Sequence, residues 1–550
     1  MDSHLRVPAC LVLVVALLSM LASGCAQAAQ PGPAPAVAPA ADTGPVTPKV
    51  NRVVFALNLQ TEGNDPRYAS QAGLLGIRPM YDFLVGTDAA TAKLTPEIGT
   101  EWSLEEGSAY RFKLRKGVQF HKGFGEMTAK DVLFSYENRI MPEATSQTAI
   151  ATRQIVRDVQ VVNDYEIVVR LKQADPRFLG TVAAGWEVLS KASSEKAGGK
   201  APTLTEEPIA ATGPYQFAAR TQGSFIRYQR VPFQHWRVTP DFPEFEYRLI
   251  KEDATRLAAL LAREVQLATV SNDLQPSAIN AGMKVVASPS GRDRIFASFF
   301  CCYLKEDGKY AHESPLLDPK VRRALNKAVD RDALNKAFFA GKGEPMQHGL
   351  FYPTDPYWNP RWKDQFADRY GYDPAAAKRL LAEAGYDSSK PLKMYGLYSD
   401  RFAGSDNVTD AILGFWRSVG VDTEGQTLDG NTQRAMIRNL QFTNSLYVLN
   451  SALDTFTSMA SYFSPYTARL GFDHPAAVAV FDEVQKTIDD SKVKALLTKW
   501  GDLVYDEYLD IPMLLIPIEV TINPEIVASY TFPGTLIGAY SHPEYIKAAR

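Results

Sequence analysis

The stretch from Leu94 to Asn138 carries the pattern that most restricts how this chain folds. Residues 110–115 alternate between apolar and basic side chains, in the order Tyr, Arg, Phe, Lys, Leu, Arg. Such an alternation is typical of a half-buried strand. Lys116-Gly117 then provides a turn signal, and residues 118–120 resume the apolar alternation. We therefore expect a strand, a turn and a second short strand.

A helix start follows these strands. Thr128 stands three residues before Asp131, just ahead of the apolar residues 132–134. This spacing resembles a capping box, in which the side chains at the two positions satisfy free backbone N–H groups at the helix start. Asp takes the place of the preferred Glu or Gln, and we expect a helix to begin at this point.

The same stretch resembles the signature segment of the family 5 extracellular solute-binding proteins, the peptide- and nickel-binding receptors of ABC importers. The matching residues are Trp102, Phe112-Lys113-Leu114-Arg115-Lys116-Gly117, Phe120-His121, Thr128-Ala129-Lys130-Asp131-Val132 and Phe134-Ser135. The sequence departs from the family pattern after the His, where Lys122-Gly123 and then Phe124-Gly125 replace an acidic residue and a Gly. We interpret most of these residues as shaping the fold rather than lining a pocket.

Further landmarks extend the resemblance over nearly all of Arg52 to Tyr530. Residues 211–215 resemble the family's Gly-Thr-Gly-Pro-Tyr, with Ala211 in the first position. Asp318-Pro319 and Asp373-Pro374 each place an acid before a Pro at the start of an apolar helical pattern, which predicts two well-punctuated helices. Each landmark is weak alone, and together they are a strong signal.

The resemblance implies an α/β fold of the periplasmic-binding-protein class II type, with two lobes and a hinge, in its large three-domain variant. The boundaries that we expect are 1–25 for a signal peptide with a lipobox, 26–49 for a Pro- and Ala-rich tether, 50–80 with 205–300 and 520–550 for the core of lobe I, 81–204 for an extra domain inserted in lobe I, and 301–519 for lobe II, which closes over the ligand. Within lobe I, a strand at residues 245–250 and a helix at residues 253–267 are expected from their apolar spacing.

The N-terminus has the pattern of an export signal. An apolar run from Leu11 to Ala22 is shorter than the roughly 20 residues of a transmembrane helix, and small residues lead from it to Cys25. This resembles a bacterial lipobox, which predicts lipidation of Cys25 and a protein anchored at the outer face of the cytoplasmic membrane or in the periplasm. Cleavage after Ala28 by an ordinary signal peptidase is the alternative.

The net charge argues against a nucleic-acid-binding protein, and the cysteine content argues against a fold held by a disulfide framework. A net charge of -3 over 550 residues, with no long basic run, argues against nucleic-acid binding. Besides Cys25, the mature chain would keep only the adjacent Cys301 and Cys302, which we interpret as two buried thiols in a strand, with a vicinal disulfide as the alternative.

The chemistry of common enzymes is missing from the sequence. It contains no Gly-x-Ser-x-Gly, no Walker loop, no His-Glu-x-x-His and no Cys-x-x-Cys, and its seven His residues are scattered singly. We therefore expect no catalytic residue, no metal and no cofactor. A secreted hydrolase remains the alternative from another class, because catalytic triads assemble from distant positions.

The resemblance also suggests where a ligand binds. Peptide-binding members of the family hold the ligand's amino terminus with an Asp in a Trp-x-x-Asp-x-x-acid-Pro stretch, which corresponds here to residues 448–455. Ser451 stands at the position of that Asp, Asp454 matches the later acid, and Asn450 lies beside them. A Ser hydroxyl cannot compensate an ammonium in a dry cleft. Tyr68, after the first strand, and Trp186 complete the candidate ligand-binding set.

These observations together predict a receptor that captures a solute by hinge closure and delivers it to membrane permease subunits, which work with a separate ATPase. We expect a monomer that binds a peptide or a peptide-like solute, one that is modified or lacks a free amine. A sugar, an opine or a nickel chelate is the alternative ligand class.

Overall fold

The computed structural model of the chain describes residues 47–58, 63–69, 71–87, 93–106, 108–175, 178–199, 207–288, 293–398, 402, 404–428, 430–451, 455–456, 458–459, 471–487, 489–532 and 542–550. The chain divides into the units Met1–Gly44 and Pro45–Arg550, and all described residues belong to the second. The predictions for Cys25 and for most of the tether therefore lie outside the described residues. Within these ranges, no helix combines the length and the apolar character needed to cross a bilayer.

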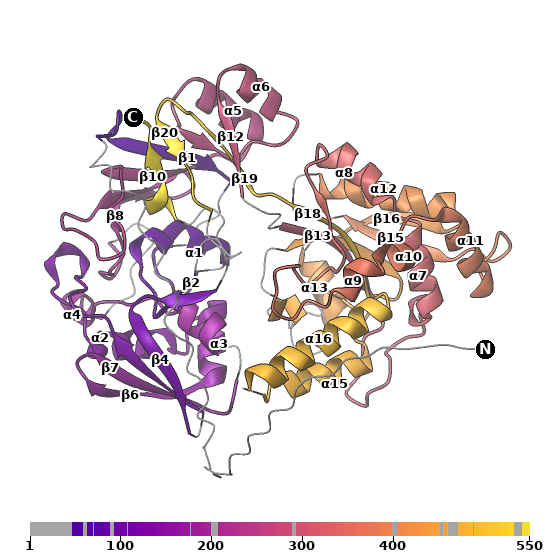
Figure 1. Cartoon of the computed structure of the whole chain (residues 1–550), viewed down its shortest axis with the longest axis horizontal. Coiled ribbons are helices and arrows are strands. Elements are labelled where there is room, and N and C mark those ends of the chain that lie inside the picture. Colours follow the sequence, from indigo (N-terminus) through magenta and orange to yellow (C-terminus); the bar gives the residue numbers. More distant parts are fainter. Residues whose placement is uncertain are drawn as a thin grey trace, which may run out of the picture. The chain divides into compact units, whose positions relative to one another are not determined.

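Lobe I is built on a seven-stranded sheet in the order β12-β19-β11-β1-β10-β9-β8. Its strands are β1 (Arg52–Leu57), β8 (Tyr215–Thr221), β9 (Phe225–Arg230), β10 (Glu244–Leu249), β11 (Leu267–Ala268), β12 (Lys284–Ala287) and β19 (Glu519–Ile522). The central strand β1 runs parallel to both β10 and β11, and it is buried almost throughout, as a strand covered on both faces must be. Indigo β1 and yellow β19 in Figure 1 show that residues from both ends of the chain enter this sheet.

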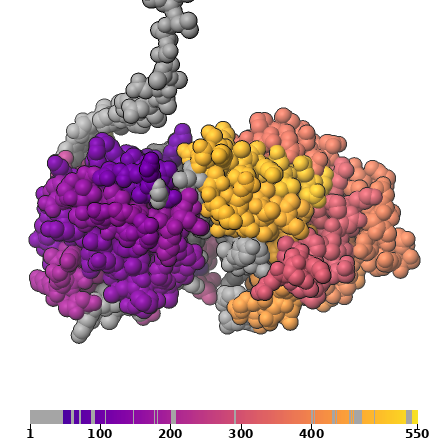
Figure 2. Space-filling view, turned by 90° about the horizontal axis from the view of Figure 1, so that it is seen from below, coloured from indigo at the N-terminus to yellow at the C-terminus, as the bar shows by residue number. Residues whose placement is uncertain are grey.

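Lobe II is built on a six-stranded sheet in the order β14-β18-β13-β17-β15-β16. Its strands are β13 (Asp293–Phe300), β14 (Glu344–Pro345), β15 (Lys393–Tyr398), β16 (Asp422–Thr427), β17 (Ser445–Ser451) and β18 (Asp510–Ile516). The lobe's helices are α7 (Pro319–Lys327), α8 (Arg331–Phe338), α9 (Arg361–Asp364), α10 (Phe366–Tyr370), α11 (Pro374–Glu383), α12 (Ser405–Ser418), α13 (Gly430–Arg438), α15 (Pro475–Val484) and α16 (Asp490–Asp506). Figure 2 shows the surface of these salmon-to-yellow elements as one continuous body.

The position of β13 corrects one predicted boundary. The sequence boundaries assign residues 205–300 to lobe I, whereas β13 pairs with β17 and β18 in the sheet of lobe II. Its residues from Arg294 to Phe300 are all buried, because β13 is a central strand with a neighbour on each side. The chain therefore changes lobe between β12 and β13, before residue 293.

Two segments of the chain pass between the lobes and are joined to each other. One leads from β12 to β13 and the other from β18 to β19. The N–H of Ser288 donates to the carbonyl of Ile518 at 2.9 Å, and the N–H of Ile518 donates to Oγ of Ser288 at 3.1 Å. Nearby, the Lys342 ammonium donates to both carboxylate oxygens of Glu519, at 2.8 and 3.0 Å, and to Oε1 of Gln275 at 2.6 Å. A hinge of two paired crossings is the feature expected of a two-lobed fold.

A four-stranded antiparallel sheet in the order β4-β5-β7-β6 forms a third core beside lobe I. Its strands are β4 (Gly99–Glu105), β5 (Ala109–Leu114), β6 (Val156–Asn163) and β7 (Glu166–Leu171), accompanied by helices α2 (Ala129–Arg139), α3 (Gln147–Ile155) and α4 (Lys191–Lys196). The remaining described helices of lobe I are α1 (Gln71–Ile77), α5 (Asp253–Leu261) and α6 (Gln275–Asn280), and the remaining short strands are β2 (Val85–Thr87), β3 (Leu94–Pro96), β20 (Val527–Ser529) and β21 (Lys547–Ala548).

The signature segment folds largely as the pattern predicts. The alternating residues form β5, and Thr128 precedes α2, where the Asp131 carboxylate accepts from the Thr128 N–H at 3.0 Å. The second short strand was a wrong prediction. Only an isolated bridge between Gln119 and Glu126 forms there, because a tight turn at residues 121–123 follows Phe120 directly.

Two other sequence patterns have different outcomes. Asp318 and Asp373 cap α7 and α11, accepting the N–H of Lys320 and of Ala376 at 2.8 Å, as their punctuation predicts. The helix expected at residues 253–267 instead ends at Leu261, whose side chain is 38% exposed. Arg263 has a φ of 63°, which stops the helix and lets residues 267–268 join the sheet as β11.

Cys301 and Cys302 are free, buried thiols just beyond the end of β13 rather than inside a strand. Burial raises the pKa of the Cys301 thiol well above its ordinary value, so this side chain stays protonated and unreactive at neutral pH. The structure thus agrees with the thiol interpretation and not with a vicinal disulfide.

A close backbone contact explains the 211–215 landmark. The N–H of Gly213 donates to the carbonyl of Met80 at 2.8 Å, and Nε2–H of His121 donates to the carbonyl of Gly213 at 2.9 Å. Burial lowers the pKa of His121 to about 4, so the imidazole is neutral and acts only as a structural donor at pH 7. The signature His therefore joins the extra domain to the lobe I loop.

We expect Gly213→Ala to destabilise the protein by roughly 1–3 kcal/mol, the usual cost of inserting atoms into a packed site. A Cβ at this position would lie 2.4 Å from the carbonyl carbon of Met80 and 2.6 Å from the nitrogen of Tyr81. The thermal unfolding midpoint is the measurement. Gly180→Ala is the matched control, because the Cβ that it adds would meet no neighbouring group within 4 Å. Equal midpoints for both variants would contradict the steric argument.

Candidate functional site

One end of the lobe II sheet holds two of the residues that the sequence singled out, Asn450 and Ser451. In antiparallel pairing, the start of β13 lies beside the end of β17, so Asp293 and Arg294 meet Asn450 and Ser451. Nδ2 of Asn450 donates to Oδ2 of Asp293 at 2.8 Å. Burial raises the pKa of Asp293 to about 6. In open α/β sheets, ligands bind outside the carboxyl ends of the strands, which here include β17 and its parallel neighbour β15.

Ser451 is engaged by a buried guanidinium. Arg294 donates from Nη2 to Oγ of Ser451 at 3.3 Å and to Oγ of Ser458 at 2.7 Å, and from Nη1 to the carbonyl of Leu350. Arg294 is fully buried, and its guanidinium lies 4.5 Å from the centre of the Tyr352 ring. Ser451 therefore presents a neutral hydroxyl next to a buried cation.

Two further residues of the stretch 448–455, Asp454 and Thr455, differ in whether the structure describes them. Asp454 lies outside the described residues. Thr455, which replaces the family's Pro, is buried and donates to Oδ2 of Asp355 at 2.5 Å and to the carbonyl of Leu350 at 3.1 Å. The described part of this edge is thus fixed by local hydrogen bonds.

Tyr68 lies on a loop of lobe I and is 40% exposed. Its N–H donates to the carbonyl of Asp65 at 3.2 Å, and the buried ion pair between Asp65 and Arg67 at 2.6 Å fixes the loop. An exposed aromatic side chain on a rigid loop is compatible with the contact to a solute that the sequence predicts.

The placement of Trp186 differs from the sequence expectation. Its side chain is fully buried in the core of the extra domain, where its ring stacks on Tyr136 with the centroids 5.7 Å apart. The flanking Glu187 forms a buried ion pair with Arg139. The sequence suggested that Trp186, which follows an apolar stretch and lies between Gly185 and Glu187, faces the second lobe, whereas its ring packs in the core of the extra domain.

Asp82 joins the start of the extra domain to the loop after β9 through its buried carboxylate. Oδ2 accepts from Nε1 of Trp236 at 2.9 Å and from Nε2 of His235 at 3.2 Å, and Oδ1 accepts from Nη2 of Arg237 at 3.1 Å. Its side chain has no exposure to solvent. The Arg237 guanidinium and the His235 hydrogen bond outweigh the burial and hold the pKa of Asp82 below its ordinary value.

Arg237 continues this network to the C-terminal segment. Nη1 donates to Oε1 of Glu544 at 2.7 Å, and Nδ1–H of His542 donates to the same oxygen at 3.0 Å. His542 and Arg237 together lower the pKa of Glu544 to about 2, despite its burial. Two carboxylates, Asp82 and Glu544, therefore flank one guanidinium.

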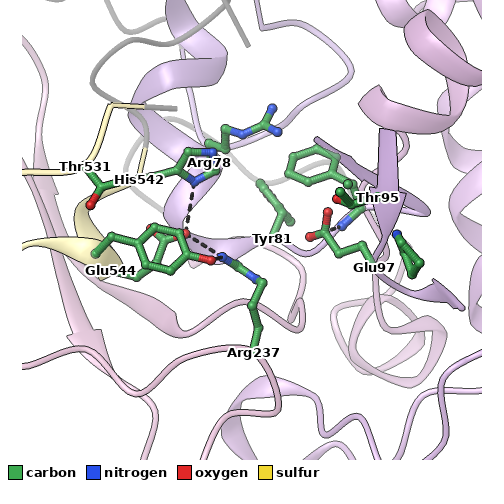
Figure 3. Close-up of a pocket in the computed structure, with 12 residues that line it drawn as sticks. Arg78, Tyr81, Thr95, Glu97, Arg237, Thr531, His542 and Glu544 are labelled. Carbon is green, nitrogen blue, oxygen red and sulfur yellow. Dashed lines mark hydrogen bonds and ion pairs between the residues drawn. The ribbon is translucent and has the colours of Figure 1, made fainter. Parts of the chain in front are cut away.

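A cavity of about 320 Å³ opens beside this network. Figure 3 shows Arg78, Glu97, Arg237 and Glu544 around it, with the dashed interactions running from Glu544 to His542 and Arg237. The apolar part of its wall comes from Tyr81, Phe83, Pro96 and Tyr545. Its lining residues all come from lobe I and the start of the extra domain.

No group of three or more His, Cys, Asp or Glu side chains with the geometry of a metal site occurs among the described residues.

Sequence reasoning missed Asp293, Arg294, Arg78 and Glu97. The first two could have been noticed, because they are charged residues placed directly before an apolar strand. Arg78 and Glu97 have no comparable local signal, since the cavity that they line forms only when distant segments meet.

The comparisons with known proteins agree with this architecture. The sequence model of the bacterial extracellular solute-binding proteins, family 5 middle, matches residues 93–470. A heme-binding protein A from Haemophilus influenzae is 26% identical over 392 residues, which cover 67% of this chain and 68% of that protein. A dipeptide-binding protein from Escherichia coli is 27% identical over 369 residues, covering 63% and 65% of the two chains. The alignments thus span about two thirds of these curated relatives.

Among solved structures, NikA from Brucella suis in complex with Fe(III)-EDTA superimposes with a TM-score of 0.74. The two chains are 19% identical, and the match covers 90% of this chain and 99% of the other. At this level of identity, the similarity shows a shared fold, the multi-domain class II binding-protein fold that the sequence predicts.

We expect Arg237→Met to destabilise the protein by about 3–5 kcal/mol, because it leaves the carboxylates of Asp82 and Glu544 buried without their shared cation. Urea unfolding is the measurement. Arg263→Met is the control, since its ion pair with Glu525 is more than half exposed and is worth at most about 1 kcal/mol. A loss in Arg237→Met no larger than in the control would show that the network does not hold the lobe together.

Proposed function

The chain belongs to family 5 of the bacterial extracellular solute-binding proteins, and from this premise we propose that it is the substrate receptor of an ABC importer. The match over residues 93–470 carries this proposal, supported by two sheets joined through two paired crossings. The lobes close on a solute by bending at these crossings, and the closed receptor delivers the solute to permease subunits powered by a separate ATPase. No bond in the solute is made or broken.

The ligand class that we propose is a peptide or a peptide-like solute. The dipeptide-binding relative supports this class. Ser451, held by the buried Arg294, offers no negative charge to an ammonium, which favours a solute without a free amino terminus at that position. A non-peptide solute such as a metal chelate is the second candidate, favoured by the heme-binding relative.

The residues that we propose for solute contact are Tyr68, Asn450, Ser451 and Asp454. Tyr68 is exposed on a fixed loop, and Asn450 is partly exposed at the strand end. We assign Trp186 to packing of the extra domain, because its buried ring stacks on Tyr136.

The remaining parts of the proposal concern the cell. We propose that Cys25 is lipidated, that residues 26–49 tether the folded part to the outer face of the cytoplasmic membrane, and that the receptor acts as a monomer. The apolar run before Cys25 and the Pro- and Ala-rich composition of the following residues support this arrangement.

Incubation of the purified protein with a mixture of peptides, followed by mass spectrometry, tests the receptor proposal. We expect intact bound peptides, and Asp454→Ala should weaken binding of a retained peptide by tenfold or more, about 1.4 kcal/mol. Lys116→Ala, on the exposed turn of the signature segment, is the control and should bind normally. Cleaved peptides would support a hydrolase instead, and unchanged affinity in Asp454→Ala would remove this residue from the site.

Membrane fractionation of the expressed full chain tests the anchor. Wild-type protein should sediment with membranes, and Cys25→Ser should move it to the soluble fraction, because the thiol that accepts the lipid is gone. Cys302→Ser controls for the loss of a thiol elsewhere. Wild-type protein that is already soluble after export would favour cleavage after Ala28.

A further inference from the structure

The cavity of lobe I holds a cation without an ionic partner among the described residues. Arg78 forms no ion pair or side-chain hydrogen bond with any of them, and its Nε is buried without an acceptor. The guanidinium lies 4.1 Å from the centre of the Phe83 ring. A buried donor without an acceptor costs about 1–3 kcal/mol, so an acceptor bound at this Nε would be stabilising.

The same cavity holds an acid that likewise forms no ion pair within the described part of the chain, although the Arg237 and Arg78 guanidiniums are close enough to oppose the rise in its pKa. Glu97 accepts the N–H of Phe83 at 3.0 Å through Oε1 and forms no ion pair with Arg78 or with any other described cation. Gly86 lies next to its other oxygen, and a Cβ on Gly86 would be 2.8 Å from Oε2. Burial raises the pKa of Glu97 to about 7. A glycine at this point leaves the carboxyl group uncovered on that side.

The other charged side chains that line the cavity already form ion pairs or hydrogen bonds with one another. Arg237 bridges Asp82 and Glu544, and His542 donates to Glu544. Arg78 and Glu97 are therefore the pair that remains for a ligand, and they are opposite in charge. A simple anion would face the acid, and a simple cation would face the guanidinium, so one ligand satisfies both groups only if it carries both charges.

We propose that this cavity binds a small zwitterion of the size of an α-amino acid, with its carboxylate on Arg78, its ammonium on Glu97 and an apolar side chain against Phe83 and Tyr545. The volume of about 320 Å³ lies at the lower end of the range of ligand pockets, which suits such a molecule. The site goes beyond the proposed receptor function, because its residues belong to lobe I and the start of the extra domain and do not include those of the lobe II sheet edge.

Calorimetry with L-leucine on the full-length protein, freed of bound solute by unfolding and refolding, tests this site. We expect L-leucine to bind, and N-acetyl-L-leucine and L-leucinamide to bind at least tenfold more weakly, because each lacks one of the two charges. Arg78→Met and Glu97→Gln should each weaken L-leucine binding by at least tenfold. Both variants should fold, since Arg78 has no ionic partner among the described residues and Gln keeps an oxygen for the Phe83 N–H.

Two controls separate this site from the proposed solute site. Arg263→Met removes an exposed arginine and should leave L-leucine binding unchanged, and Asp454→Ala should also leave it unchanged. Peptide binding by Arg78→Met should remain, so failure of one proposal does not imply failure of the other. Absence of L-leucine binding, equal binding by both derivatives, or a loss only in Asp454→Ala would overturn the zwitterion site.

The pH dependence gives a readout that a purely structural role would not produce. As the pH falls from about 8 to about 6, Glu97 takes up a proton and loses its attraction for the ammonium, so wild-type affinity should fall. The titratable and charged groups around Glu97 are Arg78, Tyr81, Asp82, Arg115, Arg237, His542, Glu544 and Tyr545. Burial raises the pKa of Tyr81 and lowers that of Arg115. Asp82, Glu544 and His542 have pKa values below their ordinary ones, and that of Tyr545 is raised. Glu97→Gln should therefore bind with little change over this range, and a parallel fall in the variant would contradict the role of Glu97.

Discussion

The buried carboxylate of Asp82 is the interaction on which the arrangement of lobe I depends. Three consecutive residues of the loop after β9, His235, Trp236 and Arg237, donate hydrogen bonds to it. Asp82 itself lies at the start of the extra domain. Arg237 extends the contact to Glu544 near the C-terminus. Because a buried charge without a partner is costly, these three segments can separate only together with the loss of several charge-assisted hydrogen bonds. The cavity beside them is a consequence of this rigid frame.

The hinge between the lobes is held by a small number of hydrogen bonds among the described residues. The hydrogen bonds between Ser288 and Ile518 join the two crossings to each other. Lys342 in lobe II reaches Glu519 and Gln275 in lobe I beside these crossings. Among the described residues, a short backbone element and the Lys342 ammonium thus connect the two lobes at the hinge.

The signature segment is a structural device, as its sequence pattern indicated. His121 is a neutral donor to Gly213 and joins the extra domain to lobe I, whereas Asp131 caps α2 inside the extra domain. The residues that we propose for solute contact come from elsewhere, from strand ends and loops. Ser451 shows the difference most clearly, because its neighbour in space is Arg294, which is 157 positions away in the chain.

The sequence by itself determined the strand of residues 109–114 and the helices that begin after Thr128, Asp318 and Asp373, because local periodicity and capping depend only on neighbouring residues. Its landmarks also indicated the fold family, through their resemblance to a known family. Only the tertiary structure decided that β13 belongs to lobe II, that Trp186 is buried, and that Arg78 and Glu97 share a cavity. Strand pairing, burial and electrostatic partners join residues far apart in the chain, and no local pattern records which distant segments will meet.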